Sequence, residues 1–251
     1  MPSFDEADVS DKPSWIRQLP ILTSDEIAHI NNRHEIRVES LQAVDDLVKG
    51  VVDTLNGANA MGNTYVFFTS DNGWHHGEHR ISTEKGRPYE EDIHIPLLVR
   101  GPGMAAGSTT YKLTVNTDYL PTFTDLACSP DPTLCETLKV QKNWYVPDGR
   151  TLLPVFERNA NAWRNAILLE AAADHGAPVS YGLRTVDSGA TTKGKYVEYN
   201  GTERELYDLG ADPYELTNVY DFASPPSALA ARLEVLKGCA GNTCRTAENG
   251  P

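Results

Sequence analysis

The densest group of side chains that could do chemistry begins at Asp71. The segment reads Asp-Asn-Gly-Trp-His-His-Gly-Glu-His-Arg, and Lys85 and Arg87 follow it. Asp71 and Asn72 offer adjacent hard oxygen donors, which suit Ca²⁺, or alternatively Mg²⁺, better than a soft metal. A cation held there would act with His75, Lys85 and Arg87 to gather an anionic ligand. We therefore predict a combined metal and anion site in this segment.

The same residues allow two other interpretations. An Asp-Asn-Gly tripeptide also forms tight turns that satisfy their own backbone. The residues from His75 to His79 match H-x-x-E-H, an inverted zinc-protease pattern that requires a regular helix. Gly73 and Gly77 flank the histidines, so such a helix is disfavoured. The sequence contains no G-x-S-x-G, P-loop or G-x-G-x-x-G motif.

Charge and length exclude several classes of protein. The 251 residues carry 22 Lys and Arg against 35 Asp and Glu, a formal net charge of −13. This balance argues against nucleic acid as the main partner. The sequence has no apolar run of about 18 residues, so we expect no membrane span. The length fits one large domain, or one domain with a small lobe.

The elements expected around the site are a helix and two strands. A helical period of apolar residues over 36–55 predicts a helix with one buried face, preceded by loop with a short helix after Ser24. Residues 64–69 are apolar on both faces and predict a buried strand of a parallel sheet, whose carboxyl end carries the site. A second strand over 95–99 and a helix over 119–127 complete an α/β pattern.

The end of the chain has a different pattern. Residues 195–199 and 205–209 alternate around Asn200-Gly201, which predicts a β-hairpin. A helix over 226–237 should end at Gly238. These elements predict a small antiparallel lobe after about residue 160.

The four cysteines form two close pairs, Cys128 with Cys135 and Cys239 with Cys244. Of the three pairings, two small disulfides are favoured, which indicates an oxidising compartment, and reduced thiols are the alternative. The first residues are acidic and do not resemble a signal peptide. Two localisations follow. The protein is intracellular, or it is secreted or periplasmic and its leader is not present in this chain.

Several stretches together carry a family resemblance. They are 40–48, 63–73, Lys85 four residues before Tyr89-Glu90, 95–103, and the tail 205–209 with Asp212-Pro213, Glu215 and Asn218. In this order and spacing the chain strongly resembles the sulfatases, particularly the branch that contains N-acetylglucosamine-6-sulfatases and related carbohydrate sulfatases. The resemblance runs from about residue 15 to 220.

The resemblance implies an alkaline-phosphatase-like α/β fold, truncated at the N-terminus, that hydrolyses sulfate esters at a Ca²⁺ and formylglycine site. By residue-level carry-over Asp71 and Asn72 are metal ligands, and Lys85 contacts the sulfate. His75 assists the leaving oxygen or binds substrate. Arg87, from the cluster described above, is a further substrate-binding residue. Residues 1–160 would form the C-terminal part of the catalytic domain, and 161–251 a small α+β subdomain.

The chain departs from the family pattern in its nucleophile. Formylglycine is made from a C-x-P-x-R motif, and the nearest segment, 128–132, has Pro132 where Arg is required. The family's Asp-Asp pair is also lacking, because Asp45-Asp46 lies within a predicted helix as a solvated pair. We therefore expect this chain to be the C-terminal half of a sulfatase. Its partner would be the N-terminal half, which carries the formylglycine. The isolated chain should be inactive.

The same residues also suit other substrates and functions. A carbohydrate sulfate ester is the first choice of substrate and an aryl sulfate the second. A non-catalytic remnant that binds anions or sulfated glycans through His75, Lys85 and Arg87 is an alternative from another class. A phosphodiesterase or phosphonate hydrolase of the same superfamily is a third.

Overall fold

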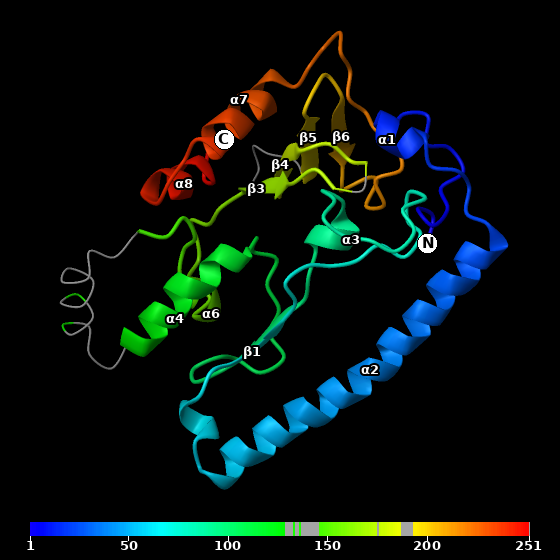
Figure 1. Ribbon diagram of the computed structural model, residues 1–251. Coiled ribbons are helices and arrows are strands. Elements are labelled where there is room, and N and C mark those ends of the chain that lie inside the picture. Colours follow the sequence, from blue (N-terminus) through cyan, green and yellow to red (C-terminus); the bar gives the residue numbers. More distant parts are fainter. Residues whose placement is uncertain (129–132, 134–135, 137–145, 175, 187–192, 251) are drawn as a thin grey trace. The chain divides into compact units, whose positions relative to one another are not determined.

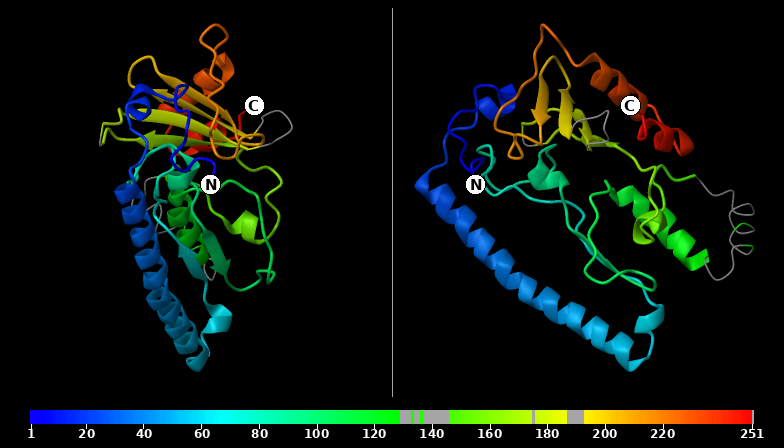
Figure 2. Two further views of the ribbon diagram at one scale, coloured as in Figure 1. Left: turned by 90° about the vertical axis from the view of Figure 1, so that its right-hand side faces the viewer. Right: turned by 180° about the vertical axis from the view of Figure 1, so that it is seen from behind.

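A computed structural model describes residues 1–128, 133, 136, 146–174, 176–186 and 193–250 (Figures 1 and 2). Its helices are α1 (Ser14–Arg17), α2 (Ser24–Gly57), α3 (Glu90–Ile93), α4 (Tyr119–Cys128), α6 (Leu153–Phe156), α7 (Ser227–Lys237) and α8 (Asn242–Ala247), with 3-10 helices η1 (Met61–Asn63) and η2 (Asn116–Asp118). Its strands are β1 (Val66–Thr69), β2 (Leu97–Arg100), β3 (Ala166–Ala171), β4 (Ser180–Thr185), β5 (Gly194–Tyr199) and β6 (Arg204–Asp208).

The chain divides into two compact units, each built from more than one segment. Unit 1 comprises Met1–Met104, Ala171–Val179 and Asp212–Asn218. Unit 2 comprises Ala105–Glu170, Ser180–Ala211 and Val219–Pro251. The predicted domain boundary near residue 160 stays a prediction.

Unit 2 contains the antiparallel sheet predicted for the end of the chain. Its strand order is β3-β4-β5-β6, and β5 pairs antiparallel with both β4 and β6. The turn between β5 and β6 includes Gly201 at φ +124°, a backbone conformation that favours glycine. The hairpin prediction is confirmed, because Tyr196 stands opposite Leu206 in the register.

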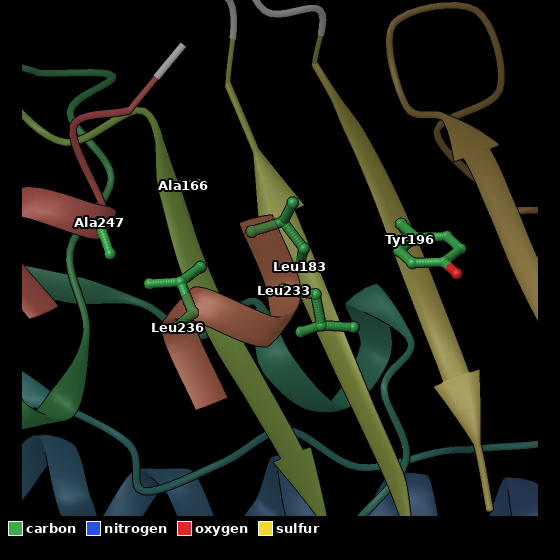
Figure 3. Close-up of a cluster of buried hydrophobic side chains, with 6 residues drawn as sticks. All are labelled: Ala166, Leu183, Tyr196, Leu233, Leu236 and Ala247. Carbon is green, nitrogen blue, oxygen red and sulfur yellow. The ribbon is translucent and has the colours of Figure 1, made fainter. Parts of the chain in front are cut away.

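The core of unit 2 lies between this sheet and the last two helices (Figure 3). Leu233 and Leu236 of α7 pack with side chains from β3, β4, β5 and α8, namely Ala166, Leu183, Tyr196 and Ala247. As predicted, α7 is followed by Gly238, and α4 spans the expected residues. The disulfide Cys239–Cys244 is also confirmed. The predicted Cys128–Cys135 pair and the segment 128–132 include residues that lie outside those described.

In unit 1, β1 was predicted as a buried strand of a parallel sheet, and that prediction is wrong. β1 pairs antiparallel with β2, with Phe67 opposite Val99. One face of this pair is open, since Phe68 and Leu98, which stand opposite each other, are 40% and 59% exposed. An apolar run indicates a strand but not the direction of its neighbour. Here the 27 residues between the strands contain only the single turn of α3 instead of the helical crossover that parallel strands normally use.

Helix α2 begins earlier than predicted and exposes more of its surface. Thr23 and Glu26 form a reciprocal capping box that starts the helix at Ser24. The predicted buried face is wrong for this structure, because Ile30 is the one buried residue in α2. The apolar stripe is 38% to 66% exposed at Ile36, Val38, Leu41, Leu47, Val48 and Val51. Asp45 and Asp46 are exposed on α2, as expected. Across the described residues, none of the helices combines the length and apolar character needed to cross a lipid bilayer.

A buried ion pair anchors the start of α4 in unit 2. Arg164 donates from Nη1 to Asp118 Oδ2 at 2.7 Å and from Nη2 to Asp118 Oδ1 at 2.6 Å, and both side chains are fully buried. Asp118 also accepts from the backbone nitrogens of Val115 and Arg150. Removing one partner of such a pair leaves an uncompensated charge in the interior.

We predict that Arg164→Met lowers the free energy of unfolding by about 3–5 kcal/mol, because Asp118 loses its bidentate partner. Urea denaturation measures this change. The matched control is Lys237→Met, which breaks a solvent-exposed pair with Glu234 and should cost at most about 1 kcal/mol. Equal losses in the two variants would contradict the prediction.

Candidate active site

The loop after β1 is held against α3 by backbone hydrogen bonds. Gly73 N donates to Asp92 O at 2.7 Å, and Trp74 N donates to Glu91 O at 3.0 Å. A Cβ atom built on Gly73 would lie 1.8 Å from Glu91 O, closer than any side chain allows. Only glycine therefore permits this close approach of the loop to α3, directly after Asp71 and Asn72.

The structure brings together three of the predicted site residues. His75 N donates to Glu84 O at 2.9 Å, which places the segment before Lys85 beside the loop. Lys85 Nζ donates to Asn72 Oδ1 at 3.2 Å and lies 3.9 Å from Asp71 Oδ2. The Asp71 side chain is 81% exposed and that of Lys85 is 49% exposed. An anion or a cation can therefore reach these groups from solvent.

His75 lies beneath this surface and is paired with a carboxylate. Its side chain is fully buried, and Nδ1 is 3.2 Å from Asp92 Oδ1. Tyr89 contacts the ring edge to face, with centroids 6.0 Å apart. Asp92 Oδ2 also accepts from Arg87 N at 2.6 Å, so one carboxylate holds both segments. A carboxylate on one ring nitrogen fixes the orientation of an imidazole.

Arg87 is buried rather than presented to solvent. Its guanidinium side chain is 1% exposed, and Nη2 is 3.0 Å from Glu84 Oε1. The guanidinium also lies over the ring of Trp15 at 5.2 Å. Its charge is therefore offset within the protein, and its predicted contact with substrate stays a prediction.

A second buried histidine and carboxylate pair lies next to the first. His79 Nδ1 is 2.6 Å from Glu6 Oε2, and His79 stacks on Tyr89 with centroids 4.4 Å apart. Burial raises the pKa of the Glu6 carboxyl to about 7, although Lys12, 3.4 Å away, opposes the shift. As expected, no helix forms over residues 75–79, so the zinc-protease geometry is not present there.

Asp71 and Asn72 fit a hard cation by ligand type but do not complete a site. Within the described part of the chain, no three His, Cys, Asp or Glu side chains gather where they could hold a metal ion. Ca²⁺ takes six to eight oxygen ligands, so these two residues would supply part of a set. Lys85 next to them would oppose a cation unless an anion bound between them.

Sequence reasoning missed Asp92 and Trp74. Asp92 contacts the predicted residues His75 and Arg87, but it lies in a short acidic helix with no motif of its own. The centroid of the Trp74 ring lies 6.0 Å from Lys85 Nζ and 5.5 Å from the Arg37 guanidinium carbon. Arg37 belongs to α2, and local spacing in the sequence does not indicate its contact with Trp74.

Two family models match the chain. The sulfatase model matches residues 6–129, and the model for the C-terminal region of N-sulphoglucosamine sulphohydrolase matches residues 77–236. The chain belongs to the sulfatase family.

Curated relatives agree with this assignment. An arylsulfatase of Volvox carteri is 34% identical, with 95% of this chain and 39% of that protein covered. An N-acetylglucosamine-6-sulfatase of Homo sapiens is 32% identical, with 90% and 44% covered. The chain thus spans about two fifths of the length of these relatives.

Solved structures confirm the alkaline-phosphatase-like sulfatase fold. BT4656 in complex with its substrate D-glucosamine-2-N,6-O-disulfate is 28% identical with a TM-score of 0.64, covering 83% of this chain and 40% of that one. BT1596, a 2-O GAG sulfatase, is 23% identical with a TM-score of 0.68, covering 94% and 50%, a likeness of fold alone.

We predict that Gly73→Ala lowers the free energy of unfolding by about 1–3 kcal/mol, because the added methyl group forces the loop away from Glu91 O. Chemical denaturation measures this loss. Gly62→Ala is the control, since a Cβ there meets nothing within 4 Å. The prediction is contradicted if both variants have the stability of the parent chain.

Proposed function

We propose that this chain carries part of the active site of a sulfuric ester hydrolase, in which Asp71 and Asn72 are metal ligands and Lys85 contacts the sulfate. One observation supports this most strongly. In a chain of the sulfatase family, Lys85 Nζ lies 3.2 Å from Asn72 Oδ1 and 3.9 Å from Asp71 Oδ2 at an exposed loop. All three residues lie within the stretches that carry the family resemblance.

In this function the residues would stabilise negative charge. Hydrolysis of a sulfate ester places charge on the sulfuryl oxygens and on the departing alcohol. Lys85 would bind a sulfuryl oxygen through its ammonium group. A bound Ca²⁺, or Mg²⁺, would supply Lewis acidity toward the same group.

We propose His75 as the group that gives a proton to the departing oxygen or binds substrate. Asp92 is its positioning residue, since the carboxylate lies 3.2 Å from Nδ1 and leaves Nε2 for the proton transfer. We also propose Arg87 as a substrate-binding residue. Together with His75 and Lys85 it forms a basic cluster in an acidic chain, and such a cluster favours an anionic ligand.

Carbohydrate sulfate esters are the proposed substrates, with aryl sulfates as the second choice. The human relative is an N-acetylglucosamine-6-sulfatase, and BT4656 was solved with a sulfated glucosamine. The algal relatives are arylsulfatases. The Cys239–Cys244 disulfide supports a secreted or periplasmic protein, and one relative is described as an extracellular sulfatase of Drosophila melanogaster.

The 251 residues do not contain the motif from which formylglycine, the nucleophile of the family, would be made. None of the four cysteines begins a C-x-P-x-R motif, from which formylglycine would be made. We propose that the formylglycine comes from an N-terminal half of the same domain, outside these residues.

The purified 251-residue chain should therefore release no sulfate from an aryl sulfate above the buffer rate, in Ca²⁺ or Mg²⁺. Ion chromatography of released sulfate measures this, with an intact formylglycine-containing sulfatase as the positive control. Measurable turnover by the pure chain would refute the proposed origin of the nucleophile.

Binding tests the site itself. We predict that Lys85→Ala weakens the Kd of the chain for glucosamine 6-sulfate at least about tenfold in calorimetry with Ca²⁺, because a charge-assisted contact is lost. Lys49→Ala, an exposed lysine on α2 paired with Asp53, should leave the Kd unchanged. An unaltered Kd in Lys85→Ala would overturn the proposed sulfate contact.

A second function is favoured by one comparison. The phosphonate monoester hydrolase of Agrobacterium radiobacter is 28% identical with a TM-score of 0.54, covering 77% of this chain and 38% of that one. Phosphonates share the tetrahedral anionic group of sulfates. Tighter binding of a phosphonate monoester than of glucosamine 6-sulfate in the same calorimetry would favour that function.

A further inference from the structure

A hollow lined by cations and an aromatic ring lies beside the candidate active site in unit 1. It has a volume of about 400 Å³ and is lined by Arg33, Ile36, Arg37, Trp74 and His76. This volume is within the range of small-molecule sites. Trp74 and His76 follow the metal-ligand candidates in the same loop, whereas the arginines and Ile36 come from α2.

Two arginines of α2 supply the positive charge of this hollow. Arg33 and Arg37 stand four residues apart on α2, where like charges face one another and destabilise a helix. Neither guanidinium has a carboxylate partner among the residues that the structure describes. Two exposed and uncompensated arginines are notable in a chain with a net charge of −13. An anion between them would remove the repulsion.

His76 lines the hollow and contacts Arg37. Arg37 Nη1 lies 2.9 Å from His76 Nε2, and because arginine can only donate, Nε2 must accept. The ring proton then resides on Nδ1, which is buried and has no hydrogen-bond partner in the described part of the chain. Burial, followed by the charge of Arg37, lowers the pKa of His76, which favours the neutral ring.

Trp74 lines the hollow and also lies near Lys85, the proposed sulfate contact. The Arg37 guanidinium carbon is 5.5 Å and Lys85 Nζ 6.0 Å from the centroid of the Trp74 ring. The two cations are thus separated by no more than the sum of these distances, about 11.5 Å. One sugar unit with two anionic substituents covers a span of this order, and an indole face suits the apolar face of a sugar ring.

We propose that Arg33, Arg37, Trp74 and His76 form a subsite for a second anionic group of a saccharide whose first sulfate is held at Lys85. The guanidinium groups would bind a sulfate or carboxylate through charge-assisted hydrogen bonds, and Trp74 would carry the sugar ring. The subsite makes the chain selective for sugars with two anionic groups. The placement of the first sulfate rests on the proposed function, whereas the binding of an anion at the arginines does not.

Calorimetry with two probes tests this on the 251-residue chain. The parent chain should bind D-glucosamine-2-N,6-O-disulfate about tenfold more tightly than glucosamine 6-sulfate. The double variant Arg33→Gln/Arg37→Gln should lose this preference and keep the affinity for the monosulfate. Both arginines are exposed, so the variant should keep its fold, which circular dichroism checks. Lys49→Gln, about 18 Å from Arg37 along the same helix, should keep the preference.

Each other result has a defined meaning. No preference in the parent chain, or an unchanged preference in the double variant, overturns the subsite. Inorganic sulfate or phosphate that competes as well as the disulfate at equal concentration overturns its saccharide specificity. If Lys85→Ala affects neither probe while the arginine variant weakens the disulfate, the proposed function fails and the anion subsite stands.

Discussion

The contact between the Gly73 backbone and α3 is the constraint on which the candidate site depends. Two backbone hydrogen bonds, from Gly73 N and Trp74 N, fasten the loop at a point where a Cβ would meet a carbonyl oxygen at 1.8 Å. On one side of this point the chain presents Asp71 and Asn72. On the other side Trp74 and His75 follow within two residues. The bond from His75 N to Glu84 O then brings Lys85 back to Asn72.

Charge is distributed in two layers around this loop. The buried layer pairs its charged and titratable groups internally, as His75 with Asp92 and Arg87 with Glu84. Such pairs position side chains, because neither member can move without leaving the other unpaired in the interior. The outer layer differs, since Lys85 and the arginines of α2 are exposed around Trp74. An acidic protein thus presents a small basic surface where an anionic substrate is proposed to bind.

Much of the local structure could be predicted from the sequence, because local rules govern it. The hairpin around Gly201, helix α7 before Gly238 and the Cys239–Cys244 bridge are set by residues close together in the chain. The convergence of Lys85 with Asp71 and Asn72 was indicated by motif spacing. The antiparallel partner of β1, the exposure of α2 and the contact of Arg37 with Trp74 depend on distant segments, which periodicity does not identify. The contact of Arg87 with Trp15 likewise joins segments that are distant in the sequence.

The central claim is that Asn72 and Lys85 belong to one anion site together with Asp71, and a double-mutant cycle tests it most directly. The Kd of glucosamine 6-sulfate in Ca²⁺ is measured for the parent chain, Asn72→Ala, Lys85→Ala and the double variant. Residues in one hydrogen-bonded site should be coupled by at least about 1 kcal/mol. Losses that add to within about 0.5 kcal/mol would show that the two residues act independently and would contradict the account.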